Sequence, residues 1–322
     1  MAGTDDGNGD GDGNADGGVI GRRGLLRAAG EAVVGGIVAE GAVRLAGGIG
    51  ERFGGRAGHG AAFADLFGFA ERSIITVGPR SAGEINALDR LTLIRLRHAL
   101  ERVVDDPTVE ELEARLTLAD LADRLSDIAT YNLCTTTGPL GSRLTAISMG
   151  YDPDDPRLDP GEGLPFVFDL QPTPELEGCS LDEIAELSVE LDHPNWRIRR
   201  PDGAPLTPEP TTPIPGTDRM RYRREFATVV VKRHPLDEAR TRGKRHLVLA
   251  GCHRDGTYAL GQSLFGGRLL DDLHDRYRTA GRPERFQAVA EFHIDTDEYV
   301  RRRGTHVPGA FDVAVAAFER LD

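Results

Sequence analysis

The sequence predicts an α/β fold in which a mostly parallel sheet carries helices on both faces, in a Rossmann-like three-layer arrangement. Two observations support this class. Apolar runs alternate with segments of helical periodicity, as at 246–278, where an apolar run ends in a glycine turn and an amphipathic segment follows. The runs Phe286–Ile294 and Phe311–Phe318 predict an antiparallel strand pair at the C-terminus, with a helix over 308–320 as the alternative.

The first half of the globular region repeats one pattern, in which a strand leads through a Gly-Pro turn into a helix. Ser73–Val77 is an apolar run typical of a buried strand, and leucines at helical spacing follow from Glu84. The segment 132–143 has the same order of apolar run, Gly-Pro turn, small residues and arginine. Between them, Thr108 and Glu111 have the spacing of a capping box, which predicts the start of a second helix.

A proline-rich segment at 151–222 is too long for a plain connection, so it is predicted to be an insertion or a lid. Within it we expect strands at Phe166–Leu170 and Trp196–Arg199, a short capped helix after Ser180, and a long final loop. Regular structure returns at Phe226–Lys232, an apolar and β-branched run that predicts a strand.

The chain begins with a glycine- and aspartate-rich tail at 1–20, which has too little apolar surface to offset the entropy of ordering and is expected to be disordered. Residues 21–56 are rich in alanine and glycine and are predicted to be helical. Their start, Gly-Arg-Arg-Gly-Leu-Leu with Arg22 and Arg23, resembles a twin-arginine signal, which implies export.

The segment departs from that signal in two ways. Charged residues interrupt its apolar core, namely Glu31, Glu40 and Arg44, and no Ala-x-Ala cleavage site precedes them. The alternative is a glycine-rich helix that packs on the domain or lies on a surface. Residues 57–322 are predicted to form a single α/β domain that contains the insertion.

Composition excludes several classes of function. A net charge of −13 argues against duplex nucleic acid as a partner, because duplex binding needs a basic face. No uncharged apolar run approaches the about 18 residues of a membrane span. The chain has three scattered cysteines, Cys134, Cys179 and Cys252, and an odd number at these spacings gives no disulfide framework. This favours a cytoplasmic location, with twin-arginine export as the alternative. The scarcity of lysine fits either a GC-rich genome or life in high salt.

Three glycine turns are the candidate ligand sites, because open α/β sheets bind ligands beyond the carboxyl ends of their strands. If all three share that edge, their amides and guanidinium groups converge on a small anionic ligand such as a nucleotide. The sequence does not identify the ligand, a cofactor or the oligomeric state. The candidate binding residues are Gly78, Arg80, Ser81, Gly138, Ser142, Arg143, Gly251, Arg254, Gly256 and Thr257.

Gly251 and Gly256 have the G-x4-G spacing of a phosphate-binding loop, but Thr257 and Tyr258 replace its lysine and its magnesium-binding hydroxyl. Nucleotide triphosphate hydrolysis by the usual route is therefore not expected. The alternative is a tight turn whose glycines only permit close packing of helix on strand.

His253 and Asp255 are the catalytic candidates, as a general base and a nearby carboxylate. Cys252 follows a buried strand directly, which favours a packing role over a nucleophilic one. The nine histidines show no metal-ligand spacing, so no metal site is predicted.

These features favour a module that binds a nucleotide or another anionic small molecule in a sensing or regulatory role. Two alternatives stay open: an enzyme acting on nucleotides or phosphoesters, and an exported or surface-attached protein whose sheet is a scaffold. The stretch 196–257 resembles uncharacterised prokaryotic α/β proteins, a resemblance that implies no particular activity.

Overall fold

The structure is a computed structural model, and the part of the chain that it describes belongs to one compact unit, Arg56–Asp322. The expected tail at 1–20 and the Ala/Gly-rich segment at 21–56, with its twin-arginine motif, lie outside the described residues. The described residues are 58–68, 73–77, 87–101, 103, 108–111, 129–139, 142–152, 163–169, 196–217, 219–235, 243–266, 268–302 and 305–322.

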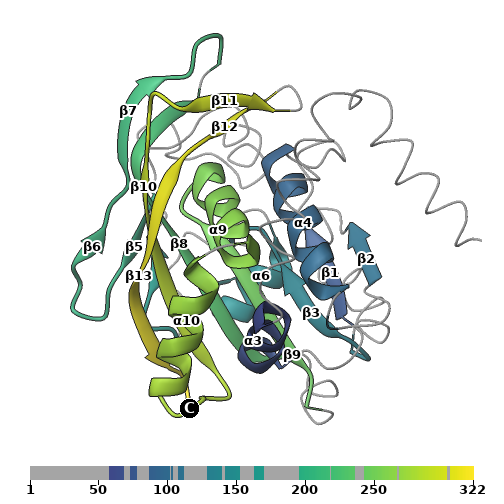
Figure 1. Ribbon diagram of the computed structural model, residues 1–322. Coiled ribbons are helices and arrows are strands. Elements are labelled where there is room, and N and C mark those ends of the chain that lie inside the picture. The colour runs from purple at the N-terminus through teal and green to yellow at the C-terminus, as the bar shows by residue number, and fades with distance from the viewer. Residues whose placement is uncertain are drawn as a thin grey trace, which may run out of the picture. The chain divides into compact units, whose positions relative to one another are not determined.

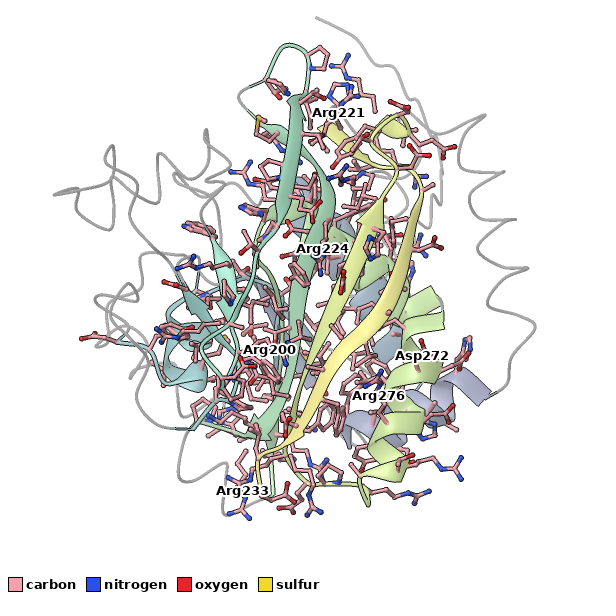
Figure 2. The ribbon with its side chains drawn as sticks, turned by 90° about the vertical axis from the view of Figure 1, so that its left-hand side faces the viewer. Arg200, Arg221, Arg224, Arg233, Asp272 and Arg276 are labelled. Atoms are coloured by element: carbon pink, nitrogen blue, oxygen red, sulfur yellow. The ribbon has the colours of Figure 1, made fainter. Side chains whose placement is uncertain are left out.

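The centre of this unit is an eight-stranded mixed sheet with the order β13-β10-β8-β9-β3-β1-β2, in which β7 also pairs with β8 (Figure 1). The longest strand, β8, runs from near Arg221 past Arg224 to Arg233 (Figure 2). In chain order the strands are β1 (Ser73–Val77), β2 (Thr108–Glu111), β3 (Asn132–Thr135), β7 (Glu209–Pro213), β8 (Met220–Arg233), β9 (Arg245–Gly251), β10 (Phe286–Ile294) and β13 (Phe311–Arg320).

The predicted mostly parallel, Rossmann-like three-layer fold is wrong. Strands β2, β1, β3 and β9 do pair in parallel, but β7, β8, β10 and β13 are joined by antiparallel ladders. The strand β8 pairs with β9 from Ala227↔Gly251 to Arg233↔Arg245, so the two strands run in opposite directions with only the residues 234–244 between them in the sequence. A connection this short cannot form the crossover that a parallel pair requires.

The predicted C-terminal strand pair is confirmed, since β10 and β13 form an antiparallel ladder rather than ending in a helix. Its register contains one irregularity. Val289 pairs with Ala317 and Ala290 pairs with Val315, so Ala316 has no opposite residue and forms a β-bulge in β13.

Helices cover one face of the sheet (Figure 1). Ala227, Val229 and Val231 of β8 point to this face and pack in one core with apolar residues of these helices, such as Leu260 and Leu273. The helices are α3 (Gly58–Phe67), α4 (Ala87–Leu100), α9 (Arg254–Gly266) and α10 (Arg268–Thr279).

The opposite face has a second core, in which Phe226 and Val230 of β8 pack with Ala146 and Phe168. It is covered by α6 (Arg143–Met149) and by a small sheet of β4 (Val167–Asp169), β5 (Arg197–Arg199) and β6 (Pro205–Leu206). Burial on both faces explains why 226–231 is a continuous buried run rather than an alternating one.

The small sheet is fastened to the main sheet by Gln287 of β10. Its side-chain amide accepts a hydrogen bond from Phe166 N at 3.0 Å and donates one to Phe166 O at 2.7 Å, as a paired strand residue would. Trp196 immediately precedes β5 of this small sheet. The attachment of the small sheet to Gln287 therefore holds the Trp196 indole near the end of β9.

The other sequence-based expectations had mixed outcomes. Ser73–Val77 is a strand, β1, as predicted. The capping box expected at Thr108 and Glu111 is wrong, because Thr108–Glu111 forms β2 and pairs in parallel with β1. The helix predicted to follow it, from 112 onward, lies outside the described residues. A capping box is a purely local pattern, and here the sheet edge supplies the backbone partners that a helix would otherwise provide.

Strands β4 and β5 lie at the predicted positions in the proline-rich segment, but its expected final loop contains β7. The helix predicted after Ser180 lies outside the described residues. The hairpin of β11 (Tyr299–Arg302) and β12 (Thr305–Pro308) was not predicted from the sequence.

Candidate functional site

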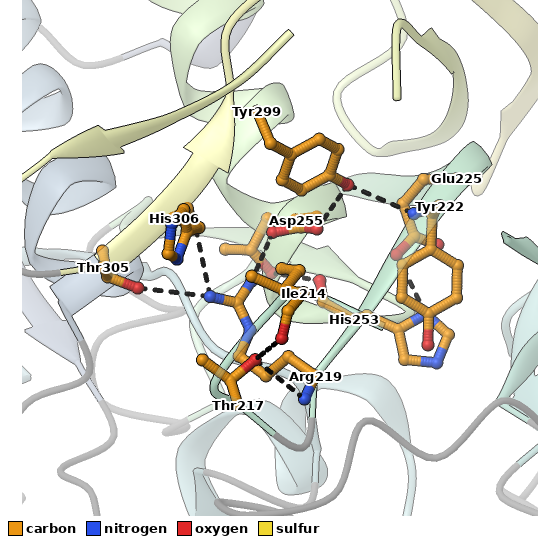
Figure 3. Close-up of polar contacts among 11 residues, drawn as sticks. Ile214, Thr217, Arg219, Tyr222, Glu225, His253, Asp255, Tyr299, Thr305 and His306 are labelled. Carbon is orange, nitrogen blue, oxygen red and sulfur yellow. Dashed lines mark hydrogen bonds and ion pairs between the residues drawn. The ribbon is translucent and has the colours of Figure 1, made fainter. Parts of the chain in front are cut away.

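The candidate site lies where the carboxyl end of β9 meets the amino end of β8 (Figure 3). Strand β9 ends at Gly251 and α9 begins at Arg254, so His253 occupies the turn between them. Because β8 is antiparallel to β9 and Ala227 pairs with Gly251, Glu225 lies directly beside this turn. The antiparallel strand that contradicts the predicted fold therefore supplies part of the site.

His253 and Glu225 form a buried pair, in which Nδ1 of the imidazole lies 2.9 Å from Oε2 of the carboxylate. The His253 side chain is 2% exposed and the Glu225 side chain is 0% exposed. The second carboxylate oxygen, Oε1, accepts a hydrogen bond from Phe226 N at 3.0 Å, which fixes the orientation of Glu225. When Nδ1 donates this hydrogen bond to the Glu225 carboxylate, Nε2 is the basic nitrogen of the ring.

Two aromatic rings hold the plane of the imidazole. Tyr222 stacks on His253 with centroids 4.3 Å apart and an angle of 18° between the planes. Trp196 is also nearly parallel to the imidazole, at 6.2 Å and 8°. The ring is therefore fixed by stacking and by Glu225, as expected for a group that acts in one orientation.

Asp255, one residue beyond the neighbour of His253, pairs with Arg219 and Tyr299. Its Oδ1 accepts from Arg219 Nη2 at 2.6 Å, and its Oδ2 accepts from the Tyr299 hydroxyl at 2.8 Å. Burial first, and then the Asp255 carboxylate, raise the pKa of the Tyr299 phenol, so this hydroxyl remains a donor.

The glycines of the turn permit close packing. A Cβ atom at Gly251 would lie 2.3 Å from Thr257 N, and one at Gly256 would lie 2.9 Å from both Glu225 Cγ and Phe226 O. The Thr257 hydroxyl accepts from Gly251 N at 2.9 Å, and Thr257 N donates to His253 O at 3.1 Å. The G-x4-G spacing thus has a packing explanation, and the Thr257 hydroxyl bonds within the turn.

The structure brings together two of the three predicted ligand turns. Strands β3 and β9 are parallel neighbours, so Gly138 and Ser142, which follow β3, leave the same sheet edge as Gly251. The Ser142 hydroxyl accepts from Thr145 N and caps α6, which starts at Arg143. The Arg143 side chain is not among those described, whereas Arg254 is half-buried at the start of α9.

The third predicted turn follows β1, which ends at Val77 and is parallel to β3. Its residues Gly78, Arg80 and Ser81 lie outside the described residues. The proposed convergence of three turns on one anionic ligand therefore remains a prediction.

Cys252 has the surroundings of a packing residue. Burial, and then the Glu225 carboxylate, raise the pKa of its thiol well above the usual value, which disfavours the nucleophilic thiolate. Within the described ranges, no group of three or more His, Cys, Asp and Glu side chains is arranged to hold a metal ion.

Sequence reasoning missed Glu225, Arg219 and Tyr299, three of the polar groups that complete the site. Each comes from a different segment, and none belongs to a recognisable motif around it. The sequence feature that could have indicated them is the turn after β9. A histidine and an aspartate directly after a buried strand both need hydrogen-bond partners.

No helix in the described part of the chain has the length and apolarity needed to cross a membrane. No family model, no curated protein and no solved structure matches this chain.

Proposed function

We propose that this chain is an enzyme in which His253 acts as a general base oriented by Glu225, on a small anionic substrate such as a nucleotide or phosphoester. The observation that carries the proposal is the 2.9 Å contact of the buried imidazole with a carboxylate that is itself fixed by a backbone amide. A carboxylate on Nδ1 sets the tautomer of the ring and makes Nε2 the proton acceptor.

The position in the sheet supports a site rather than a simple packing contact. His253 lies beyond the carboxyl end of β9, beside the turn that follows the parallel strand β3. This is the edge at which sheets containing parallel strands bind their substrates. The arginines that follow these turns, Arg143 and Arg254, are the groups expected to attract an anion.

The same geometry weakens the alternative of an anion held only by the first turn of α9. That turn already contains the Asp255 carboxylate, and the Glu225 carboxylate packs against Gly256. Two buried carboxylates repel a third anion at this place unless their partners outweigh them. We therefore propose that the guanidinium groups of Arg143 and Arg254, rather than the backbone amides of this turn alone, attract the substrate anion, and that His253 accepts the proton.

The test is a turnover assay on a panel of p-nitrophenyl phosphate, bis(p-nitrophenyl) phosphate and nucleoside triphosphates. We expect His253→Gln and Glu225→Gln to lower the rate by about 10²- to 10⁴-fold, the usual contribution of a general base. The matched control is His274→Gln, which disrupts a second His–carboxylate pair, His274 Nε2 to Asp65 Oδ2 at 2.9 Å, on the helices α10 and α3.

Equal rates in the His253 and His274 variants would contradict the proposal. Absence of turnover on the whole panel, together with a nucleotide-induced rise in melting temperature, would favour the binding module that the glycine turns predict.

A further inference from the structure

The hairpin of β11 and β12, hereafter the strap, lies across the start of α9 next to the candidate base (Figure 3). Three hydrogen bonds connect it to the site through Asp255 and Arg219. Tyr299 of β11 donates to Asp255, while Arg219 Nη1 donates to Thr305 Oγ1 at 3.2 Å and to His306 O at 3.1 Å in β12. Since Arg219 also pairs with Asp255, both strands of the strap are tied to one carboxylate.

The strap also reaches the imidazole through Tyr222. The hydroxyl of Tyr299 accepts a hydrogen bond from Tyr222 N at 3.2 Å, and the Tyr222 ring stacks on His253 at 4.3 Å. A displacement of Tyr299 therefore acts on His253 from two directions, through its stacking partner and through the first turn of α9.

The apolar attachment of the strap is small. Val307 of β12 packs with Leu88 of α4 and Tyr258 of α9 in a cluster separate from the two main cores. Arg221, at the end of β8 near the strap (Figure 2), donates to Thr296 O at 2.9 Å and lies 5.6 Å from the centre of the Tyr299 ring, which packs at the edge of a main core. Among the described strap residues, Tyr299 is the one that packs against a main core, so opening of the strap must move Tyr299 away from the edge of that core.

We propose that the strap regulates the candidate site: closed, it positions His253 through Tyr299 and Asp255, and open, it releases the ring from its working orientation. The inference rests on the proposed function, because it assigns a consequence to the orientation of the base. Asp255, Arg219 and Tyr299 are positioning residues in this scheme, since they act through His253.

The test compares Tyr299→Phe, which removes only the hydroxyl, with Tyr277→Phe, the same change on α10. Two readouts are needed, the ring ¹⁵N and ¹³C signals of His253 in NMR spectra and amide hydrogen exchange in the strap. We expect Tyr299→Phe to shift the His253 signals and to raise strap exchange about tenfold, the effect of losing one hydrogen bond to a charged group. The Tyr277 variant should change neither.

Unchanged His253 signals in Tyr299→Phe would overturn the proposal, and so would unchanged strap exchange. Thr305→Val is the second variant, because it removes one bond of the strap and leaves Asp255 and Tyr299 intact; it should also raise strap exchange, and no rise would count against the proposal. Both readouts work without turnover. If His253→Gln does not lower the turnover rate, only the proposed function is contradicted. The NMR and hydrogen-exchange results decide separately whether the strap positions His253.

Discussion

Glu225 and His253 are 28 residues apart in the sequence, and their side chains meet at 2.9 Å in the interior of the protein. The contact exists because β8 is antiparallel to β9, which brings the start of one strand to the end of the other. A fully parallel sheet would place the residues of these two strand ends on opposite edges. The chemistry proposed for the site thus depends on the reversal of direction between β8 and β9.

Replacing Glu225 by Gln should change the tautomer of His253. The carboxylate accepts a hydrogen bond from Nδ1–H, whereas the amide of Gln can donate a hydrogen bond to Nδ1 and so favour the tautomer with its proton on Nε2. Nitrogen chemical shifts of the ¹⁵N-labelled imidazole report this change directly. Asp65→Asn, which alters the partner of His274, should leave the His253 signals unchanged. An unaltered His253 tautomer in Glu225→Gln would show that Glu225 does not orient the ring.

Breaking the pair of Arg219 and Asp255 should be costly. The two side chains are 9% and 1% exposed, and removal of one leaves a buried charge without its counter-ion. We expect Arg219→Met or Asp255→Asn to lower the free energy of unfolding by about 3–5 kcal/mol, and the double variant to cost less than the sum. Urea denaturation measures these values.

The control for this cycle is the exposed pair of Arg233 and Glu284, whose side chains are 62% and 59% exposed. Water and salt screen such a pair, so Arg233→Met should cost less than about 1 kcal/mol. Similar losses at both pairs would contradict a special role for the buried one.

Acid should destabilise the fold through His246. This imidazole contacts the hydroxyls of Thr135, at 3.1 Å, and of Ser148, and burial first, then His234 and Lys232, lower its pKa well below the usual value. The unfolded chain binds a proton at this histidine below about pH 6.5, whereas the folded state does not. Stability therefore falls as the pH drops below that value, by up to about 1.4 kcal/mol per unit.

His246→Gln should flatten this dependence, because the amide can still bond both hydroxyls but does not titrate. Urea denaturation at about pH 7, 6 and 5 gives the slopes. The control, His293→Gln, changes a histidine whose side chain is 61% exposed and should retain the wild-type slope. Equal slopes in wild type and His246→Gln would refute the assignment.

Gly251→Ala should destabilise the protein severely, because the added Cβ lies 2.3 Å from Thr257 N in a turn closed by its own hydrogen bonds. The expected cost exceeds the about 1 kcal/mol of an ordinary glycine-to-alanine change, since backbone atoms must move. Gly138→Ala is the control, because a Cβ there meets nothing within 4 Å. Thermal unfolding compares the two, and equal melting temperatures would argue against the tight turn.

The thiols of Cys134 and Cys252 should be inert in the folded protein. Both side chains are buried, and burial raises the pKa of each thiol. Cys179 lies outside the described residues, so the experiment uses a Cys179→Ser background. We expect no reaction with a disulfide reagent at about pH 8 until denaturant is added. Rapid labelling of the native variant would show that one of these thiols is accessible.

Local patterns identified much of the strand content but not the strand directions. Ser73–Val77, Phe286–Ile294 and the core of β8 are apolar runs that no packing arrangement could leave in water. Direction depends on which strands become neighbours and how long their connections are, and neither is encoded within a single run. The buried stretch 226–231 resembles a parallel strand because both its faces are covered.

Of the candidate site, only the residues of the glycine turn could be predicted from the sequence. His253 and Asp255 attracted attention because a polar turn interrupts an apolar run after Gly251. Their partners, Glu225 for the first and Arg219 and Tyr299 for the second, lie 28, 36 and 44 residues away. A hydrogen-bond need can be inferred from one sequence position, but the identity of a distant partner follows only from the fold.

The bulge at Ala316 has a consequence for the behaviour of the protein at high concentration. A regular edge strand presents evenly spaced amide and carbonyl groups, onto which another molecule can add a strand and begin to aggregate. In β13 the extra residue interrupts that spacing near the middle of the strand. Concentrated solutions should therefore be protected against growth of intermolecular β-structure from this edge, and deletion of Ala316 should remove the protection.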